Sequence, residues 1–259
     1  MYYSSRRAIL LLIIALVSLT SCTRQRPRVE VQFGPSHAGH LVFHPLLPFR
    51  LMVVERHSTN GGPVSIWDVE NAEAPLRLLT LTSPALDACF APDGESIYTT
   101  TADGRIRRWS MTGDEIWSIQ AVHSGSVTVA TTSQVSTFML VSGATDGAIS
   151  FWDAKGKPID KPLQAYEGAI KLLAVDRSGT YVASVGGKQA GLIIWKKAEG
   201  SWLKLQDFHT QVTDISAISF SPQDDLLVIA SNKGLDLWRR KGDSFEVQKQ
   251  LSSREAVRV

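Results

Sequence analysis

Five tryptophans recur along the chain at a nearly constant interval, and this repeat constrains the fold more than any other feature. They are Trp67, Trp109, Trp152, Trp195 and Trp238, with gaps of 42, 43, 43 and 43 residues. Each of them ends a short strand-like run of residues. A period in the low forties is typical of a repeated unit of four short strands. We therefore expect one extended repeat array behind a leader, and not several independent domains.

The units share short strand-like runs separated by turn residues. In the second unit the runs are Leu86–Phe90, Ser96–Thr101, Ile106–Trp109 and Glu115–Gln120. Runs of this length and β-branched content are typical of strands, and Asp103-Gly104 supplies the left-handed residue that a tight turn requires. The sequence thus predicts an all-β fold of five four-stranded units, at about residues 38–81, 82–122, 123–165, 166–208 and 209–251.

Over residues 38–251 these features resemble the WD-repeat β-propeller family. In that family, a histidine near the start of a blade, a Ser or Thr, an Asp in the next turn and the Trp join in one hydrogen-bonded set. The resemblance implies that His123, Ser142, Asp146 and Trp152 form this structural tetrad in the third unit. Because buried polar groups must satisfy one another, such a set would fix the shape of the blade.

The pattern is complete only in the third unit. The second unit keeps Thr99 and Asp103 but lacks the histidine, and the fourth has Tyr166 where the histidine would be. In the fifth unit, the resemblance implies that His209 and Ser231 partner the tryptophan. The remaining tryptophans, outside the third unit, serve as blade markers.

The two ends of the array leave its closure open. After the last predicted strand, residues 252–259 look like the start of a further blade. Five blades with stray strands at both ends would leave unpaired edges, which favour aggregation. We therefore expect an incomplete or truncated version of a larger propeller. The alternative is a small or open propeller that a partner completes.

The first 21 residues are typical of a secretion signal, with Arg6 and Arg7 followed by the apolar run Ala8–Val17. Leu19-Thr20-Ser21-Cys22 resembles the lipobox of bacterial lipoproteins. That resemblance implies that Cys22 becomes the lipidated N-terminus. We expect residues 22–37 to hold this cysteine, a tether and an entry strand ahead of the first blade. An uncleaved signal anchor is the alternative, but the apolar run is short against the ~20 residues that span a bilayer. Because Thr23 is not Asp, the resemblance implies the outer membrane in a Gram-negative cell.

Few residues suggest chemistry. His37, His40 and His44 lie close together, but no carboxylate or thiolate completes a metal-binding set, so surface and turn histidines are the simpler interpretation. Cys89 reads as a small core residue of a strand. His123, Ser142 and Asp146 are the residue types of a hydrolase triad, yet their place in a repeated pattern favours packing. We expect no catalytic residue, no metal and no cofactor.

The charge balance bears on the partner. Without the leader, the chain has 25 basic and 25 acidic residues, which argues against nucleic acid because such binding needs a basic face. We therefore expect a lipid-anchored, extracytoplasmic, non-catalytic propeller that binds proteins at the bacterial cell envelope. The alternatives are a propeller enzyme, such as a lactonase or glycan-active hydrolase, and a structural subunit of an envelope assembly complex.

Overall fold

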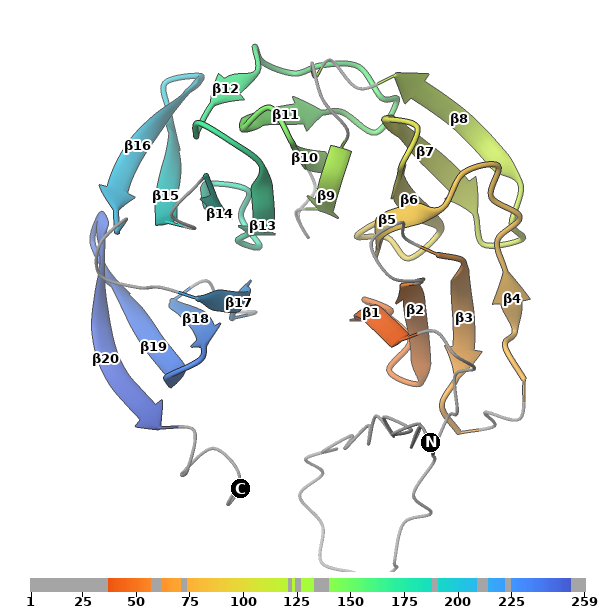
Figure 1. Ribbon diagram of the computed structural model, residues 1–259, viewed down its shortest axis with the longest axis horizontal. Helices are drawn as coiled ribbons and strands as arrows, with labels where there is room; N and C mark the ends of the chain where they lie inside the picture. Colours follow the sequence, from red (N-terminus) through yellow and green to blue (C-terminus); the bar gives the residue numbers. More distant parts are fainter. Residues whose placement is uncertain are drawn as a thin grey trace, which may run out of the picture.

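The computed structural model describes residues 37–56, 62–70, 74–120, 123, 127–132, 140–187, 191–208, 214–221 and 225–252. These residues form five four-stranded antiparallel sheets (Figure 1). The leader with Cys22, the loop residue His209 and the segment 253–259 lie outside the described residues. Within the described ranges, no helix is long and apolar enough to cross a membrane.

The strands follow one another blade by blade. Blade 1 holds β1 (His37–Phe43), β2 (Arg50–Arg56), β3 (Val64–Asp68) and β4 (Arg77–Leu78). Blade 2 holds β5 (Ala85–Phe90), β6 (Ser96–Thr101), β7 (Arg105–Ser110) and β8 (Glu115–Gln120). Blade 3 holds β9 (Val127–Thr132), β10 (Leu140–Ala144), β11 (Ala148–Trp152) and β12 (Leu163–Gln164). Blade 4 holds β13 (Ile170–Val175), β14 (Tyr181–Gly186), β15 (Gly191–Ala198) and β16 (Ser201–Asp207). Blade 5 holds β17 (Ile215–Phe220), β18 (Leu226–Ser231), β19 (Gly234–Lys241) and β20 (Ser244–Ser252).

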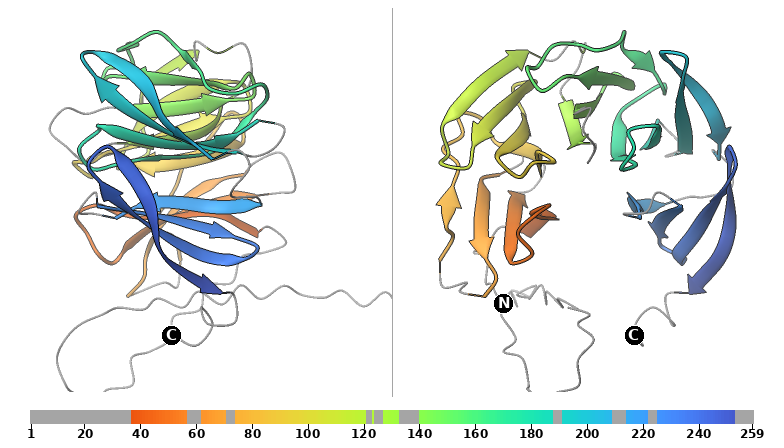
Figure 2. Two further views of the ribbon diagram at one scale, coloured as in Figure 1. Left: turned by 90° about the vertical axis from the view of Figure 1, so that its left-hand side faces the viewer. Right: turned by 180° about the vertical axis from the view of Figure 1, so that it is seen from behind.

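The five sheets stand around a common axis as the blades of a β-propeller, so the predicted all-β propeller with five blades is confirmed. The first strand of each blade lies innermost, and blades 1 and 5 flank an open sector of the arc (Figure 1). The strands run across the thickness of the disc (Figure 2). We call the face on which the innermost strands begin the start face, and the face on which they end the end face.

Most of the apolar core lies between neighbouring blades. Four tryptophans occupy these interfaces, and each belongs to a core that its blade shares with the preceding blade. Trp152, for example, packs with Tyr98 and Ile106 of blade 2. Trp67 of blade 1 instead lies in a separate cluster with Leu51 and is only half-buried. The repeated tryptophan thus joins one blade to the next.

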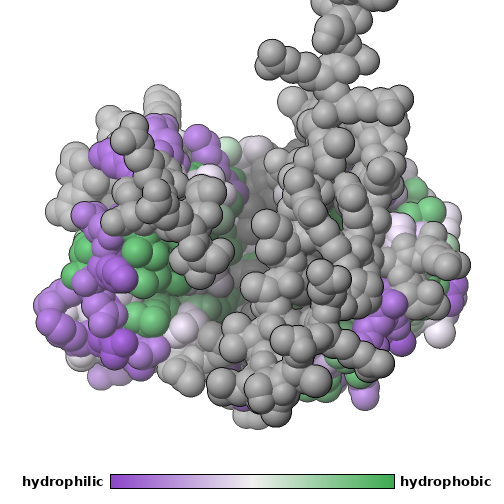
Figure 3. Space-filling view, turned by 90° about the horizontal axis from the view of Figure 1, so that it is seen from below, coloured by the Kyte–Doolittle hydropathy of each residue, from purple (hydrophilic) through white to green (hydrophobic). Residues whose placement is uncertain are grey.

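How fully the second strand of a blade is buried depends on how many blades pack against that blade. In blades 2, 3 and 4 every residue of β6, β10 and β14 is buried, because a blade packs on each face. In β18 of blade 5 burial alternates, with Leu227 and Ile229 buried and Leu226 and Val228 partly exposed. Seen from the open sector, hydrophobic residues gather at the surface of blade 5 (Figure 3). One face of blade 5 is therefore accessible in the described structure.

We expect Trp152→Ala to lower the free energy of unfolding by about 3–5 kcal/mol, because it empties a large site between blades 2 and 3. Trp152 is 1% exposed. Urea denaturation at neutral pH measures the effect. Leu203→Ala is the matched control, since Leu203 is 55% exposed and its loss should change stability by about 0.5 kcal/mol or less. Equal effects of the two substitutions would contradict this packing.

Candidate functional site

The residues of the predicted tetrad meet in blade 3. Trp152 Nε1 donates a hydrogen bond to Ser142 Oγ at 2.8 Å, and His123 Nε2 lies 3.1 Å from the same oxygen. The carboxylate of Asp146 lies 3.6 Å from His123 Nδ1, which is too long for a hydrogen bond. It accepts the backbone N–H of Ala148 at 3.0 Å instead. Trp152, Ser142 and His123 are thus linked directly by hydrogen bonds. Asp146 places its negative charge near the imidazole and stabilises the β10–β11 turn.

This group lacks the accessibility that a catalytic triad requires. The side chains of Ser142 and His123 are fully buried, so neither presents an atom to a substrate. Burial lowers the pKa of His123, and the Asp146 charge opposes that shift without cancelling it. A neutral imidazole between a hydroxyl and a carboxylate serves to position the blade.

Blades 2 and 4 lack the histidine and hold their polar groups in different ways. In blade 4 the hydroxyl of Tyr166 lies 3.0 Å from Ser184 Oγ, which also accepts Trp195 Nε1 at 2.9 Å. In blade 2 the guanidinium of Arg107 pairs with the turn carboxylate of Asp103 at 2.6 Å. Hydrogen bonding from Arg107 holds the pKa of Asp103 well below its usual range.

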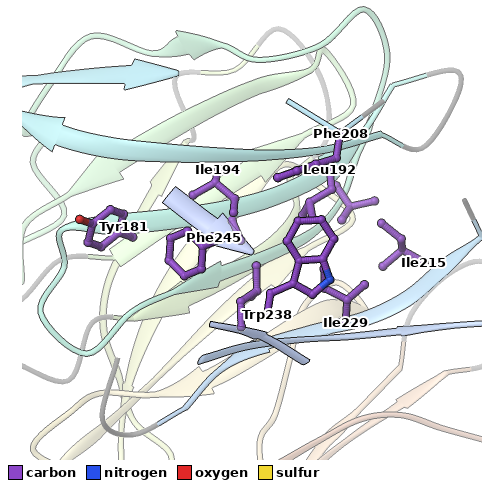
Figure 4. Close-up of a cluster of buried hydrophobic side chains, with 11 residues drawn as sticks. Tyr181, Leu192, Ile194, Phe208, Ile215, Ile229, Trp238 and Phe245 are labelled. Carbon is purple, nitrogen blue, oxygen red and sulfur yellow. The ribbon is translucent and has the colours of Figure 1, made fainter. Parts of the chain in front are cut away.

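The predicted set of blade 5 is wrong at Ser231. Trp238 pairs across the sheet with Leu227, so the residue in the position of the Ser or Thr is Ile229. Ser231 lies at the turn and accepts the backbone N–H of Lys233 at 3.2 Å. Among the described residues, which do not include His209, the buried Trp238 indole N–H has no hydrogen-bond partner. Phe208, Ile215 and Ile229 surround the ring (Figure 4). The spacing in the sequence reveals the error. Ser231 precedes Trp238 by seven positions, whereas Ser142 precedes Trp152 by ten.

Blade 1 uses a local solution. Trp67 Nε1 donates to Ser65 Oγ, two residues earlier on the same strand, at 2.8 Å. Trp67 pairs across the sheet with Leu51. The position two residues after this partner, which holds the accepting Ser or Thr in blades 2 and 3, is occupied by Val53 in blade 1.

The histidines considered as metal ligands take on separate contacts. His40, on the innermost strand of blade 1, is hydrogen-bonded through Nδ1 to the carboxylate of the buried Asp87 on the innermost strand of blade 2. His37 lies at the start of β1. Among the described residues, no three His, Cys, Asp or Glu side chains are placed to hold a metal ion. Cys89 is buried in the core between blades 2 and 3, and burial raises the pKa of its thiol.

His44 has a role that the sequence did not reveal. Its Nδ1 accepts the backbone N–H groups of Leu46 and Leu47 at 3.1 and 3.0 Å, and its Nε2 donates to the carbonyl of Gly94 at 3.0 Å. The ring packs against Phe90 with centroids 4.8 Å apart. His44 therefore folds the β1–β2 loop and joins it to blade 2. The His-Pro step that precedes two leucines is the only sequence signal for this loop.

Other polar contacts join the blades at the end face. Trp117 Nε1 and the Arg108 guanidinium of blade 2 both donate to the carbonyl of Ala154 in blade 3, at 3.3 and 3.0 Å. Between blades 4 and 5, Lys196 pairs with Asp243 at 2.5 Å. The end face of the propeller is thus held by contacts that the repeat pattern does not encode.

Because no residue in the described part of the chain accepts the Trp238 N–H, Ile229→Thr should be tolerated better than the same change at another buried site. The threonine hydroxyl would offer this N–H an acceptor and offset part of the lost apolar burial. Ile149→Thr, at a fully buried isoleucine of blade 3, is the matched control. We expect Ile229→Thr to retain about 1 kcal/mol more unfolding free energy than the control in urea denaturation. A larger loss at Ile229 would show that the indole gains no partner.

The lowered pKa of His123 predicts that stability falls as the pH drops below about 6.5. The unfolded chain binds a proton at the usual value of 6.5, whereas the folded chain resists protonation. Stability is therefore greatest above that value and is lost as the pH falls towards the folded pKa. Urea midpoints measured from pH 7.5 to 5 would follow this change. His123→Gln should flatten part of the profile, and an unchanged slope would assign the pH dependence to other groups.

A comparison with protein families matches one part of the chain. Residues 77–110 match the model described as WD domain, G-beta repeat. The matched segment begins at β4 of blade 1 and ends with β7 of blade 2. The repeat as a sequence unit is therefore offset from the blade as a structural unit.

Curated relatives are similar over part of their length. The chain is 27% identical to Protein Rae1 of Drosophila melanogaster over 139 residues, which are 51% of this chain and 38% of that protein. It is 28% identical to Ribosome biogenesis protein YTM1 of Coprinopsis cinerea over 135 residues, 50% of this chain and 30% of that protein. With Periodic tryptophan protein 2 of Saccharomyces cerevisiae, identity is 26% over 203 residues, 67% of this chain and 22% of that protein. The chain thus spans well under half the length of these relatives.

A solved structure shares the fold. A chain in the crystal structure of the Mitotic Checkpoint Complex superposes with a TM-score of 0.65 at 20% identity, covering 78% of this chain and 63% of that chain. Together with the matched segment, this similarity supports a WD-repeat type of β-propeller.

Proposed function

We propose that this chain is a lipid-anchored, extracytoplasmic propeller that binds other proteins and catalyses no reaction. The observation that supports the proposal best is the burial of the His123, Ser142 and Asp146 group. The one constellation with the residue types of a hydrolase is part of the blade framework, as the contacts above describe. What the propeller offers to other molecules is therefore the surface of its loops, where rigid scaffolds commonly carry binding residues.

The loops of the two faces differ in what they offer. On the start face, Thr145 in the β10–β11 turn and Glu167 in the β12–β13 connection are exposed. On the end face, Lys155 in the β11–β12 turn is exposed. These positions surround the ends of blades 3 and 4, which are buried against neighbours on both sheet faces. A partner bound there would meet a rigid surface and would lose little conformational entropy of the propeller on binding.

Names of the similar proteins support protein partners in general terms. The similar solved chain belongs to a structure named as a complex, and a similar curated protein is named for ribosome biogenesis. Nothing in those names concerns a bacterial envelope. The envelope part of the proposal is supported by the signal-like leader and by the Leu19–Cys22 segment.

A propeller enzyme remains the alternative, and one observation favours it. His40 and Asp87 form a histidine–carboxylate pair on the innermost strands, where a channel ligand would pass. Asp87 Oδ1 also accepts the backbone N–H of Ala88 at 2.9 Å, which makes the pair a bridge between blades 1 and 2. Lactone or glycan hydrolysis that disappears in His40→Ala, with stability unchanged, would favour the enzyme.

Photo-crosslinking in the native envelope tests protein binding. We expect a crosslinking residue at Thr145 and one at Glu167 to capture the same protein, because both lie on the start face. The matched control is Leu203 on the outer strand β16, which should capture none. Absence of any protein adduct at Thr145, Glu167 and Lys155, combined with tight binding of a sugar or small molecule, would contradict the proposal.

The anchor has its own test. Cys22→Ala should prevent lipidation and shift the protein from the detergent-extracted membrane fraction to uncleaved precursor or released protein. Metabolic labelling with a fatty acid should be lost in the same variant. Cys89→Ala is the control, because Cys89 is buried and should leave labelling unchanged. Unchanged membrane partition of Cys22→Ala would contradict the lipobox interpretation.

A further inference from the structure

Exposed apolar side chains concentrate on blade 1. Nine large hydrophobic side chains are exposed in the described part of the chain, and five of them belong to this blade. They are Phe43, Leu46, Leu47, Leu76 and Leu78. Three of the five fall within the five residues from Phe43 to Leu47. Since single exposed apolar residues are ordinary but a cluster is not, this segment needs an explanation.

The loop presents its leucines through its own structure. The two hydrogen bonds that His44 Nδ1 accepts fix the backbone of Leu46 and Leu47, and the backbone N–H of Arg50 closes the loop on the Leu47 carbonyl at 3.0 Å. Gly94 lies so close to the His44 ring that a Cβ there would sit 2.2 Å from it. Leu46 is 66% exposed although the residue two positions earlier is buried. The leucines are held away from the core by a rigid support.

The composition of the loop favours lipid over a polar ligand. From Leu41 to Phe49 the chain contains no acidic or basic residue, and the imidazole of His44 is already engaged. Gly94 of blade 2, which contacts His44, stands between the exposed residues Asp93 and Glu95. They would repel anionic headgroups, and Arg50 is the one basic residue close by in sequence. The surface therefore fits a zwitterionic membrane interface.

The tether allows this loop to reach a membrane. Fourteen residues separate Cys22 from His37, and their extended length is about 45 Å. Strand β1 carries the chain about 23 Å from the start face to the end face. A lipid on Cys22 can therefore lie in the same bilayer that the end-face loop touches.

We propose that the segment Phe43–Leu47 rests in the interface of a zwitterionic bilayer and orients the anchored propeller with its end face towards the membrane. This inference rests on the proposed lipid anchor at Cys22. It leaves the start face, with Thr145 and Glu167, directed away from the lipid and open to a protein partner.

Depth-dependent quenching in vesicles tests the proposal. The full lipidated protein is reconstituted into phosphatidylethanolamine–phosphatidylcholine vesicles that contain brominated acyl chains. An environment-sensitive fluorophore is attached to Leu47→Cys, and Leu203→Cys on blade 4 is the matched control. Buried Cys89 is protected from labelling. We expect quenching at position 47 to be at least about fivefold stronger than at 203, and Phe43→Cys to behave as position 47 does.

Further arms separate the outcomes. Replacing half of the lipid with phosphatidylglycerol should weaken quenching at position 47, and Asp93→Asn with Glu95→Gln should restore it. If the protein floats with the vesicles but position 47 is not quenched, the loop proposal fails while the anchor stands. If the fluorophore at position 47 becomes shielded from water only after a protein extract is added, the loop binds a protein partner and the proposal is overturned. If the protein does not float with the vesicles, the anchor fails and this inference fails with it.

Discussion

The buried indole N–H of the repeated tryptophan is the constraint on which the blades depend. A large aromatic side chain packs well between two sheets, but its N–H must find an acceptor there or cost about 1–3 kcal/mol. In blades 2, 3 and 4 a hydroxyl on the neighbouring strand accepts it, from Thr99, Ser142 and Ser184. Blade 1 uses a serine of the same strand, and in blade 5 no described residue accepts the N–H. The strand register of each sheet places the same position opposite the indole, and the residue found there decides whether the N–H gains an acceptor.

Much of the fold could be predicted from the sequence because one side chain recurs at one spacing. The tryptophan period gave the number of sheets, and turn residues such as Asp103-Gly104 gave most strand limits. Short outer strands were less predictable. The last strand of the first predicted unit, at residues 38–81, is only Arg77–Leu78, because Leu79 leaves the edge to pack in the core between blades 1 and 2. Edge strands carry few residues that need burial, so their pattern is weak.

The polar groups were harder to predict than the strands. Ser231 was assigned by residue type, whereas cross-strand register decides which residue faces the indole, and a shorter hairpin in blade 5 moved that position to Ile229. Arg107 was missed because it reaches the turn carboxylate from the third strand, where the family pattern expects no partner. His44 was interpreted among surface histidines, although both of its nitrogens are used inside the structure. A single sequence indicates which polar residues are present, but the packed sheets determine which of them meet.

The tryptophans of blades 2 to 5 each pack towards the blade before their own. This arrangement has a consequence for how such a chain can change over generations. A duplicated segment that began and ended at blade boundaries would carry a tryptophan whose packing site belongs to the preceding blade. The tryptophan finds an equivalent packing site whenever a similar blade precedes its own. Copies of a blade can therefore be added without changes to the residues of the interface. The segment that matches the WD domain, G-beta repeat model runs from the outer strand of one blade into the third strand of the next. Inheritance of such a unit copies a junction between blades together with the strands it joins.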